Sequence, residues 1–219
     1  SGVNILDGEG KTYKVTSTLN MTSNTVLQNL TINFATASNS CLAATGTQGS
    51  ALTLTSDSNY PTRTVNLSTS DAATLAEGDM VFITDSQDFV TSVDRSEINF
   101  VSAVSGTTVT LLSEVFTDYT TANSATISKI TPKENIVLRN VNLSGANDAT
   151  TPANQSGLDF DKCKNINLES CKFEKFDTRL TRFKRSAHIH ISGCYFSNSD
   201  RSGFGYGVTV SSVSYTHLT

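Results

Sequence analysis

Apolar and polar residues alternate in three short segments of the C-terminal third of the chain. The segments are IVLRNVNL (136–143), INLESCKF (166–173) and IHISGCYF (189–196). Their apolar positions coincide when the segments are aligned, and Ile166 and Ile189 hold equivalent places 23 residues apart. Alternation with a period of two is typical of β-strands that bury one face. The pattern therefore predicts a repeated unit of short strands.

A second set of strands is expected in GLDF (157–160), LTRF (180–183) and GVTV (207–210). One repeat cannot bury its apolar face alone, so consecutive repeats must stack and share a core. Stacked parallel strands lie about 4.8 Å apart, which places equivalent side chains in ladders such as Phe160 above Phe183. Near the N-terminus, TVLQNLTI (25–32) fits the same columns.

This arrangement resembles the right-handed, single-stranded parallel β-helix of the pectin-lyase-like superfamily. The resemblance covers residues 1–50 and 135–212, and the opening LDGEGKTYKV is similar to the first coils of phage tail spikes and secreted polysaccharide-degrading enzymes. It implies an all-β protein. It says little about any one reaction, because function resides in sites that are grafted onto a fold.

Residues 55–134 interrupt the repeat with short β-rich runs, joined by turns such as Glu77-Gly78-Asp79. They predict a small β-barrel or sandwich inserted into the helix. The stretch is similar to an insert found near the N-terminal end of phage and bacterial β-helix proteins. Two interpretations stay open, a structural knob and a carbohydrate- or partner-binding module.

The predicted organisation has four parts. Residues 1–54 form the first coils, residues 55–134 the insert, and residues 135–212 the continued coils. The last residues, 213–219 (VSYTHLT), resemble a translated sequencing-library adapter, with an ordinary terminal strand as the alternative. His217 is therefore left out of every site considered below.

Composition supports β-structure and narrows the chemistry. Thr, Ser and Asn, which are weak helix formers, make up more than a third of the chain. The net charge of −4 and the scattered basic residues give no footprint for nucleic acid. No apolar run has the length of a membrane span. The Cys residues lack CxxC spacing and the His residues lack an HExxH motif, so neither a metal nor a cofactor is expected.

Candidate chemistry lies on the outward side chains of stacked strands, which converge on one face of the sheet. Asp159 stands between two apolar positions, and Arg182 takes the equivalent place one coil later. In the next outward column Asp161 is followed by Lys184. Opposite charges stacked in this way predict two ion pairs, Asp159–Arg182 and Asp161–Lys184.

These four residues are the catalytic candidates. Glycoside hydrolysis uses two carboxyl groups about 5–9.5 Å apart, a separation that Asp159 and Asp161 meet as residues two apart on one strand. Polysaccharide β-elimination instead needs a base and cations, for which the candidates are Arg182, Lys184, Arg185 and His190. The alternative is structural, because stacked ion pairs set strand register and contribute about 0.2–1 kcal/mol each.

His190, Phe204 and Tyr206 are the candidate substrate-binding residues. The two aromatic residues belong to a Gly-rich loop without the spacing of a phosphate-binding motif, where they can face a sugar at the edge of a groove. His188 is expected on the same strand face as His190. No third ligand has a suitable spacing, so solvated histidines are favoured over a metal site.

Two further ladders are predicted. Arg139 over Glu169 forms a third ion pair on the neighbouring sheet. Cys171 and Cys194 share an inward column, where a ladder of reduced thiols is favoured over a disulfide because same-facing neighbours in a sheet rarely meet the required geometry.

The leading hypothesis is a fragment of a β-helix protein that binds a surface polysaccharide, and whether it also cleaves it as a depolymerase (a polysaccharide lyase or a glycoside hydrolase) stays open. We expect the protein in a virion tail or as a secreted bacterial protein outside the cell. The alternative is a non-catalytic structural or adhesive appendage. The resemblance implies a homotrimer for the full-length protein. Unpaired carboxylates in an open groove would indicate an enzyme, and charges neutralised in ladders would indicate a rod.

Overall fold

The computed structural model describes residues 2–35, 39–90, 93–146, 155–199, 206–211 and 214–218. The chain divides into two compact units, Ser1–Thr45 with Lys133–Thr219, and Gly46–Pro132. We call the first the coil unit and the second the insert. Each has a hydrophobic core of its own and is described by itself.

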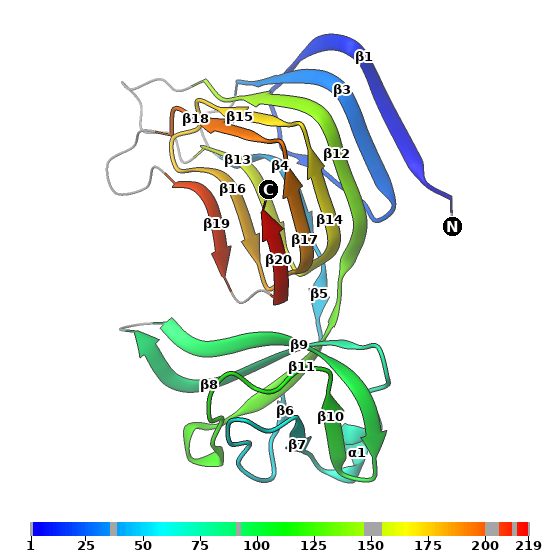
Figure 1. Cartoon of the computed structure of the whole chain (residues 1–219), viewed down its shortest axis with the longest axis vertical. Coiled ribbons are helices and arrows are strands. Elements are labelled where there is room, and N and C mark those ends of the chain that lie inside the picture. Colours follow the sequence, from blue (N-terminus) through cyan, green and yellow to red (C-terminus); the bar gives the residue numbers. More distant parts are fainter. Residues whose placement is uncertain are drawn as a thin grey trace. The chain divides into compact units, whose positions relative to one another are not determined.

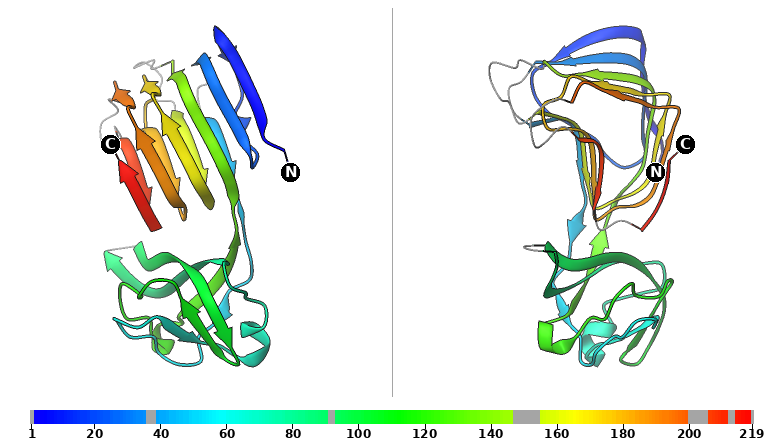
Figure 2. Two further views of the ribbon diagram at one scale, coloured as in Figure 1. Left: turned by 45° about the vertical axis from the view of Figure 1, so that its right-hand side comes forward. Right: turned by 60° about the vertical axis from the view of Figure 1, so that its left-hand side comes forward.

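The coil unit is built from two parallel sheets, whose strands follow one another around successive coils (Figures 1 and 2). The eight-stranded sheet has the order β1-β3-β12-β14-β17-β20, with β15 beside β12 and β18 beside β15; the five-stranded sheet has the order β19-β16-β13-β4-β2. The strands are β1 (Asn4–Val15), β2 (Leu19–Asn20), β3 (Thr25–Phe34), β4 (Asn39–Thr45), β12 (Lys133–Ser144), β13 (Gln155–Asp161), β14 (Cys163–Glu169), β15 (Lys172–Glu174), β16 (Arg179–Lys184), β17 (Ala187–Ser192), β18 (Tyr195–Ser197), β19 (Tyr206–Ser211) and β20 (Ser214–Leu218).

Side chains of one kind stack inside the coils in the register that the sequence columns predict. Leu138 pairs with Leu27 on one side and with Leu168 on the other, and all three are buried. Phe160 and Phe183 meet edge to face, with ring centroids 6.1 Å apart. Burial of such side chains contributes about 1.5–3 kcal/mol each, so the ladders supply most of the driving force for stacking.

Each coil turns at a residue with positive φ. At one corner these residues are Asn24, Asn135, Asn165 and His188, with φ of 58°, 58°, 55° and 54°. Asn tolerates this left-handed conformation better than most residues, and its side-chain amide can pair with the next coil. Asn135 Nδ2 donates to Asn24 Oδ1 at 2.8 Å, and Asn165 Nδ2 donates to Asn135 Oδ1 at 3.0 Å. His188 Nδ1 lies 3.2 Å from Asn165 Oδ1, so it is the protonated ring nitrogen that extends the ladder.

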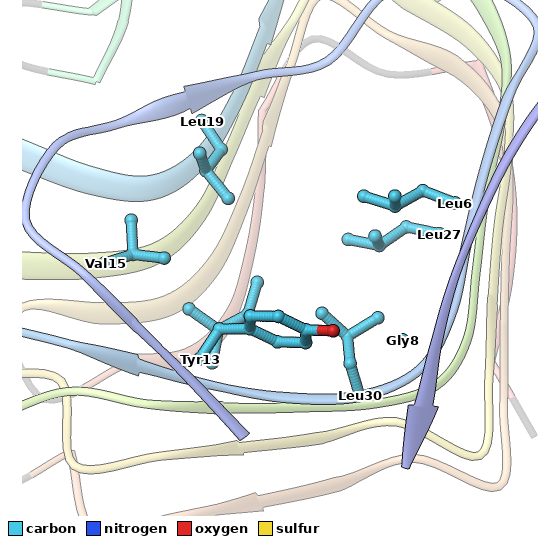
Figure 3. A pocket seen from close by; sticks show the side chains of 8 residues that line it. Leu6, Gly8, Tyr13, Val15, Leu19, Leu27 and Leu30 are labelled. Atoms are coloured by element: carbon cyan, nitrogen blue, oxygen red, sulfur yellow. The ribbon is translucent and has the colours of Figure 1, made fainter. Parts of the chain in front are cut away.

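The core ends at β1 in an apolar cavity of about 210 Å³ (Figure 3). Leu6, Tyr13 and Leu27 are among the residues that line it. Gly8 lies where β1 passes closest to β3, because a Cβ there would stand 2.4 Å from Leu30 Cβ. The missing side chain lets the first coil pack against the second.

The insert is one seven-stranded antiparallel sheet with the order β5-β11-β8-β9-β10-β7 and β6 beside β11 (Figure 1). Its elements are β5 (Thr47–Gln48), β6 (Leu52–Thr53), β7 (Thr64–Asn66), α1 (Thr69–Ala72), β8 (Met80–Val90), β9 (Val93–Ser105), β10 (Thr108–Leu111), the 3₁₀ turn η1 (Thr121–Asn123) and β11 (Thr126–Thr131). The unit begins at Gly46 rather than near residue 55 because β5 and β6 both pair with β11. None of the helices in the described residues has the length and apolarity that crossing a membrane requires.

The end of the chain is described in part. Residues 214–218, within the stretch interpreted as adapter-derived, form β20 beside β17. Residues 212, 213 and 219 lie outside the described residues, as does Phe204. The origin of residues 213–219 stays a prediction.

Cys171 and Cys194 occupy equivalent positions of consecutive coils as free thiols, as predicted for the ladder. The amide of Cys171 donates to Cys194 Sγ at 3.4 Å. Hydrogen bonds from the thiol and the amide of Cys171 lower the pKa of Cys194 to about 7, whereas burial raises the pKa of Cys41 and of Cys163 to about 12. Cys194 is only half-buried, so it is the most reactive of these thiols.

Replacing Asn165 tests the corner ladder. Asn165→Ala should lower the free energy of unfolding by about 2 kcal/mol, because an Ala at positive φ costs about 1 kcal/mol and the lost hydrogen bonds cost about as much again. Asn165→Gly, which accepts the same φ, should lose about half of that. Urea denaturation measures both, with the exposed Asn20→Ala as the control. Equal midpoints for Asn165→Ala and the control would show that the ladder contributes nothing.

Thiol alkylation tests the cysteine stack. At pH 7.5, iodoacetamide should modify the native protein at one fast site, because the thiolate is the reacting form and Cys194 has the lowest pKa of the four. Mass spectrometry should find no fast site in Cys194→Ser and an unchanged one in Cys163→Ser. A fast site that survives Cys194→Ser contradicts the assignment.

Candidate functional site

The outward face of the five-stranded sheet carries the charged side chains that the sequence predicts there. Strands β13 and β16 run parallel, with Asp159 opposite Arg182 and Asp161 opposite Lys184 (Figure 1). The residue between the two aspartates, Phe160, points into the core and is fully buried. Alternation along β13 therefore places both carboxylates on one face, as expected.

Asp159 and Arg182 form the predicted ion pair. Arg182 Nε donates to Asp159 Oδ1 at 2.8 Å, and Arg182 NH2 contacts Asp159 Oδ2. The two side chains are 27% and 22% exposed, so the pair is partly shielded from water. A two-point contact of this kind holds both groups in one geometry and raises the pKa of the guanidinium.

Asp161 is paired with Arg185 and Lys162, and not with Lys184 as the sequence predicts. Arg185 Nε donates to Asp161 Oδ1 at 2.9 Å, and Lys162 Nζ lies 2.8 Å from Asp161 Oδ2. Lys162 and Arg185 are corner residues with positive φ of 57° and 44°, and the turn brings their side chains beside the carboxylate that ends β13. Strand pairing relates only residues within the strands, so it could not predict partners that lie in the turns after β13 and β16.

The environment keeps Asp161 ionised. Burial raises the pKa of its carboxyl, but hydrogen bonds and charges from Arg185 and Lys162 outweigh burial, and the pKa falls below its usual range. A carboxyl in this state is a poor proton donor at neutral pH. In acid–base chemistry it would have to act as a base or a nucleophile.

His190 lies on a different sheet from the four catalytic candidates Asp159, Asp161, Arg182 and Lys184. It belongs to β17 of the eight-stranded sheet, in register with Asn167 of β14. The structure places His190 on another sheet than Arg182 and Lys184, as the two separate strand sets of the sequence imply, because the chain turns a corner between β16 and β17. His188 stands at that corner with positive φ and bonds to Asn165, and burial alternates along β17 so that both histidines lie outside the core.

A second polar cluster surrounds Glu169 on the eight-stranded sheet. Arg139 Nε donates to Glu169 Oε2 at 2.7 Å, which confirms the predicted third pair, and Asn167 Nδ2 donates to Oε1 at 2.5 Å. These contacts, with Arg139 the strongest and His190 adding its charge, hold the pKa of Glu169 below its usual range. Asn167 was not among the residues predicted for a site, although the sequence alignment places it one coil before His190.

Tyr206 stands on the five-stranded sheet, at the start of β19 and opposite Arg179. Half of its surface is exposed, so its ring is available to a ligand. In the described part of the chain, no group of three or more His, Cys, Asp or Glu residues is placed to hold a metal ion.

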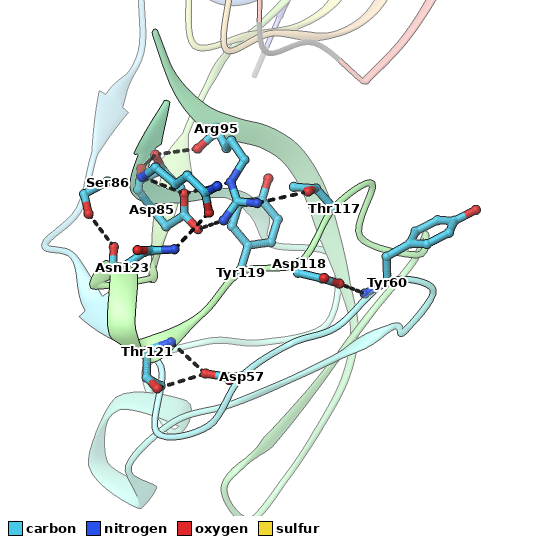
Figure 4. Close-up of polar contacts among 12 residues, drawn as sticks. Asp57, Tyr60, Asp85, Ser86, Arg95, Thr117, Asp118, Tyr119, Thr121 and Asn123 are labelled. Atoms are coloured by element: carbon cyan, nitrogen blue, oxygen red, sulfur yellow. Dashed lines mark hydrogen bonds and ion pairs between the residues drawn. The ribbon is translucent and has the colours of Figure 1, made fainter. Parts of the chain in front are cut away.

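The insert has a polar network of its own, shown in Figure 4. Asp85 and Arg95 form a largely buried ion pair, and Arg95 NH1 donates to Thr117 Oγ1 at 3.3 Å. Asp118 Oδ1 accepts the amide of Tyr60 at 2.8 Å. The Arg95–Thr117 and Tyr60–Asp118 contacts join segments that are distant in sequence, so they fix the insert's loops. Either interpretation of the insert, knob or binding module, stays a prediction.

Solved phage tailspikes share this fold. The gp54 tailspike of Acinetobacter baumannii bacteriophage AP22, solved in complex with A. baumannii capsular saccharide, matches 93% of this chain at 17% identity with a TM-score of 0.59. The tailspike gp49 from Pseudomonas phage LKA1 matches 95% of the chain at 17% identity with a TM-score of 0.56. The tailspike gp61 of Pseudomonas phage phi297 matches 87% at 12% identity with a TM-score of 0.57.

The chain spans 40%, 45% and 38% of the lengths of these three tailspikes. No protein-family model matches the sequence, and no curated protein does. At such identities the likeness concerns the fold. Together with the two parallel sheets and the antiparallel insert, it confirms the predicted all-β parallel β-helix with an inserted β-domain.

Acid titration tests the environment of Asp161. Because its pKa is lower in the folded than in the unfolded chain, ionisation stabilises the fold above the unfolded pKa of about 3.9, and this stability is lost as pH falls through the folded pKa. Asp161→Asn should therefore lower the free energy of unfolding by about 1–3 kcal/mol at pH 7, and the difference should shrink at acidic pH. Urea denaturation from pH 7 to pH 3 measures this, with Glu134→Gln as the control. A difference that does not change with pH contradicts the assignment.

Proposed function

We propose that this chain is part of a tailspike-like virion protein that binds a surface polysaccharide along the outward face of its five-stranded sheet. The observation that carries the proposal is the Asp159–Arg182 pair, two charged groups held rigidly on an exposed sheet. The fold supports it, because a tailspike of the same fold is in complex with capsular saccharide. For the full-length protein we propose a homotrimer in the virion tail.

The face offers the groups that a sugar chain needs. Sugar hydroxyls both donate and accept hydrogen bonds, so they can pair with the fixed oxygens of Asp159 and with the guanidinium of Arg182. Lys184 adds a donor on the same sheet, two residues beyond Arg182 on β16 and opposite Asp161. The exposed ring of Tyr206 can stack on the apolar face of a sugar. Parallel strands repeat these positions about every 4.8 Å along the stack.

Cleavage by Asp159 and Asp161 is the second candidate function. Their positions two residues apart on β13 correspond to about 6.6 Å, a separation suited to hydrolysis. Hydrolysis also needs a protonated carboxyl, whereas Asp161 is held ionised and Asp159 is engaged at both oxygens by Arg182. A substrate would first have to displace Arg182. The contacts therefore support binding better than cleavage at these residues.

Variants of the two sheets test this proposal. In Asp159→Asn/Arg182→Gln, loss of the fixed charges should weaken binding to purified A. baumannii capsular polysaccharides about tenfold, as measured by biolayer interferometry. Tyr206→Ala should weaken it in the same direction. Arg139→Gln/Glu169→Gln, a matched double change on the eight-stranded sheet, should leave binding unchanged.

The same samples separate binding from cleavage. New reducing ends would indicate hydrolysis, and absorbance from an unsaturated uronide would indicate elimination. If cleavage is found and Asp159→Asn and Asp161→Asn retain the full rate, these two residues are not catalytic. Equal binding by the two double variants would contradict the assignment of the binding face.

A further inference from the structure

A hollow of about 420 Å³ opens at the ends of β1, β3, β12 and β15 in the eight-stranded sheet. Lys14, Asn33, Ser144 and Lys175 contribute its polar side chains, and Phe34 and Gly145 are among its other lining residues. Its volume lies within the range of small-molecule sites. Four groups that can donate hydrogen bonds thus surround one hollow.

Strand register brings these groups together from four strands. Lys14 of β1 is opposite Asn33 of β3, and Asn33 is opposite Ser144 of β12. Ser144 is in turn opposite Glu174 of β15, which Lys175 follows directly. Neighbouring strands lie about 4.8 Å apart, so Lys14, Asn33, Ser144 and Glu174 form a row across the stack, and Lys175 stands one residue beyond its end.

Gly145 shapes the end of the cavity beside Lys175. A Cβ at Gly145 would stand 2.1 Å from the carbonyl oxygen of Lys175, so no other residue fits without moving the backbone. The amide of Gly145 donates to Glu174 O at 2.9 Å, and Lys175 turns the corner with φ of 61°. The close approach of the two coils therefore fixes where the Lys175 side chain leaves the backbone.

The charged residues among the described lining of the cavity are both lysines, so this lining is positively charged. Lys14 and Lys175 are exposed, and neither forms an ion pair within the part of the chain that the structure describes. The carboxylate in the same row, Glu174, is already paired with Lys172 at 2.8 Å. Two ammonium groups with an amide and a hydroxyl beside them match an oxyanion, which accepts hydrogen bonds at every oxygen.

We propose that this cavity is a subsite for an acidic sugar unit, with Lys14 and Lys175 holding its carboxylate and Asn33 and Ser144 donating to neighbouring oxygens. The inference rests on the proposed function, since it takes the ligand to be part of a polysaccharide, and it adds that the polysaccharide is acidic. A phosphate substituent has the same chemistry and is separated by the experiment. Two lysines are too few for the basic stripe that nucleic acid requires.

The test uses D-glucuronate and D-galacturonate as probes, with D-glucose as the neutral counterpart. At low ionic strength, titration with either acid should shift the NMR amide resonances of Asn33, Gly145 and Ala146, and D-glucose should not. Lys14→Gln and Lys175→Gln should each weaken the affinity about tenfold. Lys11→Gln is the matched control, because it makes the same change on the same strand at a lysine paired with Glu9.

Three outcomes would overturn the inference: no shifts with either acid, equal shifts with D-glucose, or an equal loss in Lys11→Gln. Competition by inorganic phosphate as strong as the binding of the sugar acids would show a simple anion site and would also overturn it. Failure here is distinct from failure of the proposed function. Capsular polysaccharide binding that depends on Arg182 and Tyr206 would stand even if the cavity binds no acid.

Discussion

The left-handed corner that recurs in each coil is the constraint on which the rest of the coil unit depends. A turn at positive φ disfavours most side chains and leaves backbone groups exposed. Asn135 and Asn165 tolerate this conformation, and their side-chain amides form hydrogen bonds there. Their amides pair from coil to coil, so each corner is held at a fixed height above the last. With the corners aligned, the strands between them have one register. The apolar ladders of the core and the charged columns of the surface both follow from it.

One consequence of that register is that outward charges meet their equivalents one strand away. Like charges in such a column would repel, and the five-stranded sheet accordingly places Arg182 against Asp159. The pairing steadies the face and occupies both carboxylate oxygens. It leaves polar groups in a fixed arrangement suited to recognition, and it disfavours the free, protonated carboxyl that hydrolysis needs. The charges of Lys14 and Lys175 are not neutralised in this way, because the acid beside them, Glu174, is already paired with Lys172.

Sequence columns predicted this register well, and they were less reliable where the chain leaves a strand. The pairs Asp159–Arg182 and Arg139–Glu169 lie within strands, where a period of two relates sequence to face. Asp161 ends its strand, and its partners come from the corner, where no period applies. His190 and Arg182 were both candidates for polysaccharide elimination. The intervening corner sends them to different sheets.

The sequence by itself determined the coil fold, its inward ladders and the presence of an insert. These features depend on local alternation repeated at a constant spacing, and such information is fully contained in the order of residues. Only the tertiary structure decided that Lys14 and Lys175 share a cavity and that Asn167 joins the Arg139–Glu169 pair. Lys14 and Lys175 lie more than 150 residues apart in the chain. The stacking distance between coils makes them neighbours, and that distance is a property of the folded backbone.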